Sequence, residues 1–463
     1  MLLLFAAGGA TEAAERPSFL VILCDDLGYG DLGCFGHPAI KTPHLDQLAA
    51  EGLRLTDCYS AAPICSPSRA GLLTGRTPSR SGVYSWIASG NPMQLPASER
   101  TIAALLREAG YDTCHVGKWH LNGHFNSPRH LQPGDHGFDH WFSTQNNAAP
   151  SHENPTNFVR NGEKVGPLTG YSCQVVADEA INWLKGRRGS DAPFFQFVCF
   201  HEPHEPIASP PELVAHYPDA VKQGEALYYA NVENMDAAVG RLLAALDELH
   251  LSEGSLVIFT SDNGPETLDR YAGAWRSHGS PGPLRGMKLH LYDGGIRVPG
   301  IVRWPGRVKA GQASNVPVAS LDFLPTFCEL AGVDVPTDKP LDGTSLAGFL
   351  RGEELRRERP LFWHYYGGIG NRQVGVRHGD WKLVAGWDGP HDMPAGASLN
   401  PGTVDQLRAS RLTAFELYDV RQDVDEVEEL STRATSEYDR LRTFAQETYG
   451  EVLKEGPNWV FEK

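Results

Sequence analysis

Three short apolar runs along the chain each end in polar side chains. Uninterrupted apolar runs of this length are typical of buried parallel strands. In open α/β sheets, binding sites lie at the carboxyl ends of the strands, so we expect these polar residues to meet in one crevice. The runs are SFLVILC, FFQFVCF and SLVIFT, and the polar residues that follow them are Asp25-Asp26, His201 and Ser261-Asp262-Asn263.

Amphipathic helical patterns separate these runs. We predict helices at residues 42–52, 101–110, 228–250 and 321–331. The first opens with a Thr-Pro pair, which suits a helix N-terminus, and the last is followed by Gly332, which suits a C-terminus. The alternation of strands and helices predicts an α/β fold with a large, mostly parallel sheet sandwiched by helices.

The pattern changes near residue 356. Short runs at 362–366, 373–377 and 381–385 are separated by Gly and Asp turns, and a helical stretch follows at 431–454. We therefore predict a main domain over residues 18–355 and a smaller C-terminal α+β subdomain over 356–463, which contains a short antiparallel sheet.

Residues 1–17 read MLLLFAAGGATEAAERP, which is similar to the end of a secretory signal, although the apolar run is short and no basic residue precedes it. We expect export to a periplasmic, extracellular or lysosome-like compartment; a disordered tail is the alternative. Elsewhere the chain has no stretch that is long and apolar enough to span a membrane.

Acidic residues outnumber basic ones, with 57 Asp and Glu against 41 Lys and Arg and a formal net charge of −16. This balance argues against a nucleic-acid partner. A site for an anionic group must then be a local cluster of basic residues. The eight cysteines are scattered without a CxxC pair, so we expect mostly free thiols and one disulfide at the most.

The adjacent pairs Asp25-Asp26 and Asp262-Asn263 offer short oxygen ligands at two strand ends. Such oxygens suit a hard cation, calcium or alternatively magnesium, and do not suit zinc. Either pair alone is equally typical of a turn or a helix cap, so the prediction depends on the two pairs meeting.

The run Cys65-Ser66-Pro67-Ser68-Arg69, followed by Thr74-Gly75-Arg76, resembles the signature of the sulfatase family. Further segments resemble family motifs in the same order: CDDLGYGD (24–31), GKWHL (117–121), HEPH (201–204), SDNG (261–264) and RGMK with YDGGIRVP (285–299). The family more often has Glu where this chain has Asp293.

This resemblance implies a sulfatase whose Cys65 is oxidised to formylglycine by a separate maturation enzyme. It implies that Asp25, Asp26, Asp262, Asn263 and the modified residue 65 hold the cation. It also implies roles for five further residues: Arg69 binds the hydrated aldehyde, Lys118 and Lys288 neutralise sulfate, His120 is the base in sulfate release, and His201 lies near the leaving oxygen.

The segment 279–306 is most similar to sulfatases that act on carbohydrate sulfates, so we expect a sulfated sugar as the substrate. Two alternatives remain at this point: a phosphate or phosphonate monoester hydrolase on the same scaffold, and a non-catalytic glycan-binding protein. The sulfate position and the oligomeric state stay open. Side chains that could contact a sugar ring are His204, Trp275, His278 and His364, with Trp86, Asn147 and His152 as weaker candidates.

Overall fold

The structure is a computed structural model that describes residues 16–389 and 402–460. The predicted export signal falls almost entirely on residues 1–15 and thus lies outside the described residues. No helix in the described part of the chain is long and apolar enough to cross a membrane. All eight cysteines are free thiols, and seven of them are buried, as expected for core cysteines.

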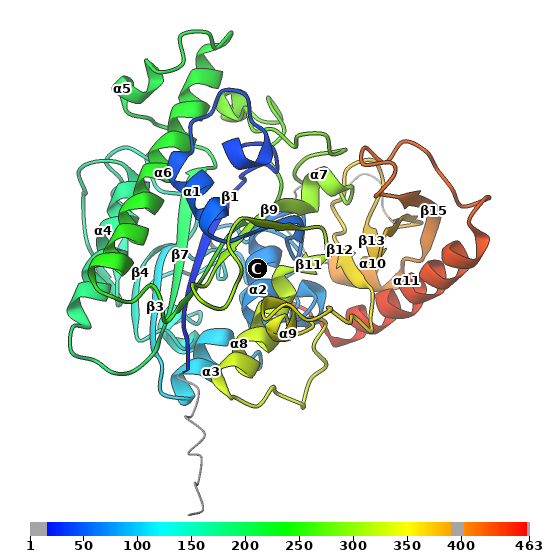
Figure 1. The fold of residues 1–463 in the computed structure, drawn as a ribbon. Coiled ribbons are helices and arrows are strands. Elements are labelled where there is room, and N and C mark those ends of the chain that lie inside the picture. Colours follow the sequence, from blue (N-terminus) through cyan, green and yellow to red (C-terminus); the bar gives the residue numbers. More distant parts are fainter. Residues whose placement is uncertain (1–15, 390–401, 461–463) are drawn as a thin grey trace, which may run out of the picture.

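The main domain is built on one large mixed sheet, which confirms the predicted fold class (Figure 1). Its strand order is β10-β2-β9-β8-β1-β7-β3-β4-β5-β6, with β11 paired to β2. The five central strands β8, β1, β7, β3 and β4 are parallel, and β9 runs antiparallel to both β8 and β2. The strands are β1 Ser18–Asp25, β2 Leu53–Tyr59, β3 Asp112–Lys118, β4 His140–Thr144, β5 Val159–Arg160, β6 Glu163–Lys164, β7 Phe194–Pro203, β8 Ser255–Ser261, β9 Arg297–Arg303, β10 Gln312–Ser314 and β11 Val318–Ala319.

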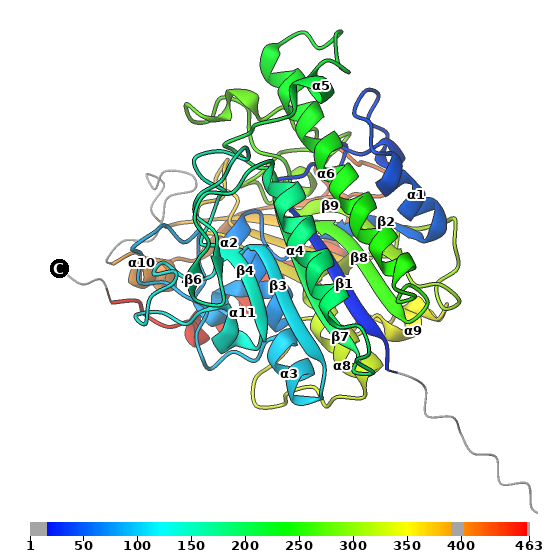
Figure 2. The same ribbon diagram turned by 90° about the vertical axis from the view of Figure 1, so that its left-hand side faces the viewer.

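Helices cover both faces of this sheet, and α4 and α6 lie across the strands on one side (Figure 2). A hydrophobic core lies on each face of the sheet, and alternate residues of β1 point into one or the other. Leu20 and Ile22 pack with α1, α4 and α6, whereas Phe19 and Val21 pack with α3 and α8. This two-sided burial explains why the strand is apolar throughout. The helices are α1 Pro43–Glu51, α2 Cys65–Thr74, α3 Ile102–Glu108, α4 Ser172–Gly186, α5 Pro211–Val214, α6 Gln223–Glu248, α7 Asp293–Ile296, α8 Phe323–Ala331 and α9 Ala347–Leu350.

A second, antiparallel sheet follows in the order β12-β13-β14-β15, and α11 packs across it (Figure 1). The predicted boundary at residue 355 falls between α9 and β12. The elements are β12 Leu361–His364, β13 Val374–His378, β14 Trp381–Trp387, α10 Thr403–Ala409, β15 Leu412–Asp419 and α11 Thr435–Glu455.

Buried ion pairs join the two sheets. The Arg377 guanidinium of β13 lies 2.6 Å from a carboxylate oxygen of Asp57 on β2, and the Lys382 ammonium of β14 lies 2.6 Å from Asp293 on α7. Arg297 contacts both carboxylates, at 2.6 Å and 3.3 Å. Asp293, the departure from the family pattern, therefore lies in the contact between the sheets.

Candidate active site

The carboxyl ends of β1 and β8 bring the two oxygen-rich pairs together. The strands are parallel neighbours with Cys24 opposite Ser261, so Asp25-Asp26 and Asp262-Asn263 leave the sheet side by side. The Asp26 amide donates to Asp262 Oδ1 at 3.3 Å, and Asn263 Nδ2 donates to Asp26 Oδ1 at 2.7 Å. The meeting of the two pairs on which the cation prediction depended is thus present in the structure.

Cys65 is the first residue of α2 and lies against these carboxylates. Ile64 is extended, with a φ of −158°, and the helix begins at Cys65, before Pro67. Proline is tolerated in a first helical turn because the N–H groups there have no partner in the helix. The Sγ atom and one carboxylate oxygen each of Asp25 and Asp262 lie within 4.8 Å of one another. Burial raises the pKa of the Cys65 thiol to about 11, so an unmodified thiol stays protonated at neutral pH.

The donor atoms at this point fit a hard divalent cation. Asp25 Oδ1 and Asn263 Oδ1 are buried and have no hydrogen-bond partner. Buried oxygens without a partner are costly and rare in folded proteins. Burial and the neighbouring Asp25 raise the pKa of Asp262 to about 7 against the opposing effect of the Arg69 guanidinium, so further positive charge at this point would stabilise the carboxylate. Oxygens of this kind are ligands for calcium or magnesium.

Three cationic side chains surround the carboxylates. Arg69 Nη2 lies 2.7 Å from Asp262 Oδ2, and Lys118 Nζ, at the end of β3, donates to Asp25 Oδ2 at 2.5 Å. Lys288 Nζ lies 2.7 Å from Asp26 Oδ1. Against the effect of burial, the Asp26 carboxylate raises the pKa of Lys288, so its ammonium stays charged. This is the local basic cluster that an anion site in an acidic protein requires.

A cavity of about 340 Å³ opens on Cys65. Cationic, aromatic and amide side chains share its wall, which is the composition of a site for a polar ligand with flat faces. Its lining residues are Ile64, Cys65, Trp86, His120, Asn146, Asn147, His204, Glu266, Arg270, Tyr271 and Lys288.

Two histidines line this cavity, and a third does not. Both ring nitrogens of His120 lack a partner, and burial with the nearby Lys118 ammonium holds the pKa of His120 well below its usual range. His204 Nε2 lies 3.5 Å from Asp26 Oδ2. His201 instead hydrogen-bonds Thr144 Oγ1 through Nε2 at 2.8 Å, packs on Phe158 and is absent from the cavity wall.

Other candidates lie elsewhere in the structure. Trp275 is 41% exposed, and neither it nor His278 lines the Cys65 cavity. His364 is buried, bonds Ser79 Oγ and packs on Tyr449. His152 is also buried, 3.7 Å from Glu202.

Five lining residues were not predicted from the sequence: Ile64, Asn146, Glu266, Arg270 and Tyr271. Glu266 and Arg270 follow the SDNG segment with the spacing of an ion pair, which was the available signal: Arg270 Nη2 lies 2.6 Å from Glu266 Oε2. That carboxylate also lies 3.5 Å from Lys288 Nζ and so helps to position this lysine.

Two family models match the chain. The model described as Sulfatase matches residues 17–333, and the model described as N-sulphoglucosamine sulphohydrolase, C-terminal, matches residues 287–393.

Curated relatives match over most of the chain. N-acetylgalactosamine-6-sulfatase of Canis lupus familiaris is 38% identical over 393 residues, which cover 79% of this chain and 72% of the relative. Steryl-sulfatase of Rattus norvegicus is 34% identical over 437 residues, which cover 77% of this chain and 74% of that relative. Among solved structures, Ps i-CgsB in complex with k-i-k-neocarrahexaose superposes with a TM-score of 0.80 at 27% identity, covering 96% of this chain and 95% of that one.

Proposed function

The chain belongs to the sulfatase family and is a sulfuric ester hydrolase, and from this premise we propose that it removes sulfate from a carbohydrate with a nucleophile derived from Cys65. The observation that carries the proposal is the position of the Cys65 Sγ, within 4.8 Å of oxygens of Asp25 and Asp262. A thiol at the start of a helix has no structural need of two buried carboxylates, whereas a cation-assisted nucleophile does.

Two groups from outside the chain complete this proposal. A maturation enzyme oxidises Cys65 to formylglycine, whose hydrate would supply the attacking hydroxyl, and calcium or magnesium held by Asp25, Asp26, Asp262 and Asn263 would lower the pKa of that hydroxyl. The partnerless oxygens of Asp25 and Asn263 support this ligand set.

The charged side chains of the site bind the sulfate group. Lys118 and Lys288 are fully or almost fully buried, and they hold positive charge beside residue 65. In a cavity with little water, fixed cations stabilise the negative charge that builds up on the sulfuryl oxygens. The free backbone N–H groups in the first turn of α2 add to this stabilisation. Arg69 holds Asp262 in place and orients the side chain at position 65.

Two histidines take part in the proposed reaction. His120 is neutral and has no hydrogen-bond partner, so it can accept a proton from the side chain at position 65 as sulfate leaves. We assign the contact with the leaving-group oxygen to His204, because His204 lines the cavity and His201 does not. We therefore assign to His204 the contact with the leaving oxygen that was expected of His201.

The lining of the cavity supports a sugar as the leaving group. Trp86 and Tyr271 offer flat rings, while Asn146, Asn147 and Glu266 offer hydrogen bonds. A pyranose has apolar faces and polar edges, so this mixture matches it. One relative is named for N-acetylgalactosamine 6-sulfate and one solved neighbour holds a neocarrahexaose, which supports the same class of substrate.

The test is production of the chain together with a formylglycine-generating enzyme. We expect mass spectrometry to show the thiol-to-aldehyde mass loss at position 65. We also expect sulfate release from 4-nitrophenyl sulfate and from members of a panel of position-defined sulfated sugars. Full activity with an unmodified Cys65 would contradict the mechanism. Faster hydrolysis of 4-nitrophenyl phosphate than of 4-nitrophenyl sulfate would contradict the reaction. Faster hydrolysis of a steroid sulfate than of every sugar sulfate would contradict the substrate class.

A further inference from the structure

A second cavity, of about 480 Å³, lies beside the catalytic one. The two share no lining residue, yet the same two chain segments border both. Trp86 lines the catalytic cavity and Ser89 the second one; likewise Asn146 lines the first and its neighbour Gln145 the second. Because three residues of extended chain span only about 10 Å, the two cavities are close neighbours.

An edge hairpin forms one wall of the second cavity. Strands β5 and β6 are joined by Asn161-Gly162, both with positive φ (49° and 93°), as a tight type I′ hairpin turn requires. Pairing of β5 with β4 fixes the hairpin on the sheet, and Val159 lies opposite Lys164 in it. The fold thereby holds Lys164 at the edge of the cavity.

Asn157 ties this wall to the catalytic cavity. Its Nδ2 donates to the carbonyl of Asn147 at 2.8 Å, and its Oδ1 accepts from the amide of Ala149 at 2.9 Å. The Asn147 side chain in turn accepts from Lys118 Nζ at 3.3 Å. The floor between the two cavities is therefore a hydrogen-bonded unit.

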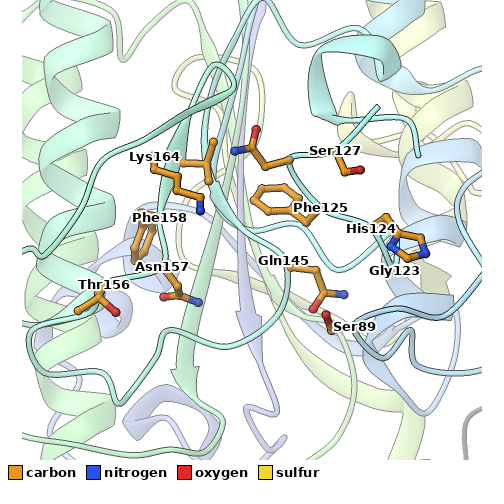
Figure 3. A pocket seen from close by; sticks show the side chains of 12 residues that line it. Ser89, Gly123, His124, Phe125, Ser127, Gln145, Thr156, Asn157, Phe158 and Lys164 are labelled. Atoms are coloured by element: carbon orange, nitrogen blue, oxygen red, sulfur yellow. The ribbon is translucent and has the colours of Figure 1, made fainter. Parts of the chain in front are cut away.

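The chemistry of the second cavity suits an anionic sugar. Among the described lining residues Lys164 is the one with a full charge, and no carboxylate lines the cavity, although the protein carries a net charge of −16. Figure 3 shows the Lys164 ammonium between Phe125 and Asn157, with Gln145 beside Phe125. An aromatic ring, an amide and an ammonium that has no ion-pair partner among the residues that the structure describes can together stack on a sugar ring and bind an acidic substituent on it.

We propose that this cavity is a second carbohydrate subsite, which binds the sugar unit adjoining the one that loses its sulfate and selects for a sulfate or carboxylate on that unit through Lys164. The inference rests on the proposed function, because it takes the catalytic cavity as the place of the first sugar. The enzyme would then bind two neighbouring sugar units of an anionic polysaccharide.

The test compares Lys164→Gln with the wild-type enzyme on two substrates. One is the sulfated oligosaccharide that the wild type desulfates fastest, and the other is 4-nitrophenyl sulfate, whose single ring fills only the catalytic cavity. We expect KM for the oligosaccharide to rise about tenfold, the value of one charge-assisted hydrogen bond, with kcat on 4-nitrophenyl sulfate unchanged. Phe125→Ala should also raise the oligosaccharide KM, and Lys309→Gln, an exposed lysine between β9 and β10, should change neither value.

Two outcomes separate the inference from its premise. Unchanged oligosaccharide KM in both Lys164→Gln and Phe125→Ala, with turnover intact, would overturn the second subsite and leave the proposed function standing. Turnover of 4-nitrophenyl sulfate without turnover of any sugar sulfate would overturn the proposed substrate class and the subsite with it. An equal rise in KM for oligosaccharides with and without an acidic group on the adjoining unit would overturn the selection by Lys164.

Discussion

At the residue scale, position 65 bears most directly on turnover. Cys65→Ala removes the nucleophile, so we expect kcat on 4-nitrophenyl sulfate to fall by about 10⁴-fold or more, with a nearly unchanged Tm. Cys114→Ala is the matched control, since Cys114 is also a buried thiol but lies within β3. It should cost stability and leave the turnover of the folded enzyme intact. Residual turnover by Cys65→Ala close to that of the wild type would contradict the assignment.

The two histidines of β7 and the following loop allow a second prediction. His204→Ala should lower kcat by about 10²-fold or more with little change in Tm, because it removes from the cavity wall the side chain that we assign to the leaving-group oxygen. His201→Ala should instead lower Tm, because it leaves the Thr144 hydroxyl without its 2.8 Å partner and opens space beside Phe158. The measurements are kcat on 4-nitrophenyl sulfate and thermal unfolding. Equal kcat losses in the two variants would contradict the assignment.

The sequence alone could not separate these histidines. The chain reads His201-Glu202-Pro203 and then His204-Glu205-Pro206, the same tripeptide twice. β7 continues to Pro203, so the first histidine is part of the sheet and the second follows its end. By contrast, the aspartates and Cys65 could be placed from motifs because each one follows directly from a strand end or a helix start.

At the scale of elements, Asp293 joins α7 to the second sheet. It contacts Lys382 and Arg297 and lies 3.8 Å from Arg377. Asp293→Asn removes a carboxylate that contacts all three of these buried cations, so we expect a loss of about 3–5 kcal/mol in the free energy of unfolding. Urea unfolding measures it, with Asp380→Asn, at an exposed ion pair, as a control that should cost less than about 1 kcal/mol. A loss of that small size for Asp293→Asn would show that the pairing does not hold the sheets together.

Glu426 belongs to the same contact, since one of its carboxylate oxygens lies 3.0 Å from Lys382 Nζ, and it makes the stability of this contact depend on pH. Burial raises the pKa of Glu426 from its usual 4.5 to about 7. The folded protein therefore holds this proton more tightly than the unfolded chain does, and stability contributed by Glu426 is lost as pH rises from about 4.5 to about 7. The free energy of unfolding of Glu426→Gln minus that of the wild type should thus be larger at pH 8 than at pH 5. Urea unfolding at both pH values measures this difference. The opposite trend would contradict the raised pKa.

Local pattern predicted β1, β7, β8 and the first three strands of the second sheet, together with α1, α3, α6, α8 and α11; α4 and β9 are among the elements that it missed. No side chain within α4 caps its start; Glu202 of β7 accepts hydrogen bonds from Ser172 and from the Cys173 amide instead. β9 contains Pro299 and Gly300, which argue against a strand inside a sheet. The partners that stabilise these elements, Glu202 for α4 and strands β2 and β8 for β9, are distant in sequence, so local pattern does not reveal them.

At the scale of the whole molecule, the proposed cation joins β1, β8 and the start of α2. A ligand that binds only the folded state stabilises it, by about 2.7 kcal/mol at a concentration of 100 Kd. We expect chelator treatment to lower Tm and turnover, and calcium or magnesium to restore both. Asp262→Asn should lose this response, while Asp191→Asn, at an exposed position, should keep it. A Tm that no divalent cation changes would contradict the site.

The burial of the Cys65–Arg69 segment also constrains the order of events in biosynthesis. All five of its residues are buried, and Cys65 itself is 3% exposed, so a second enzyme cannot reach the thiol once the sheet and α2 have packed. In the maturation that we propose, oxidation of Cys65 therefore takes place on a nascent or still open chain. The share of active molecules in any preparation is then decided while the polypeptide is being made, and later incubation of the native protein with the maturation enzyme should not increase it.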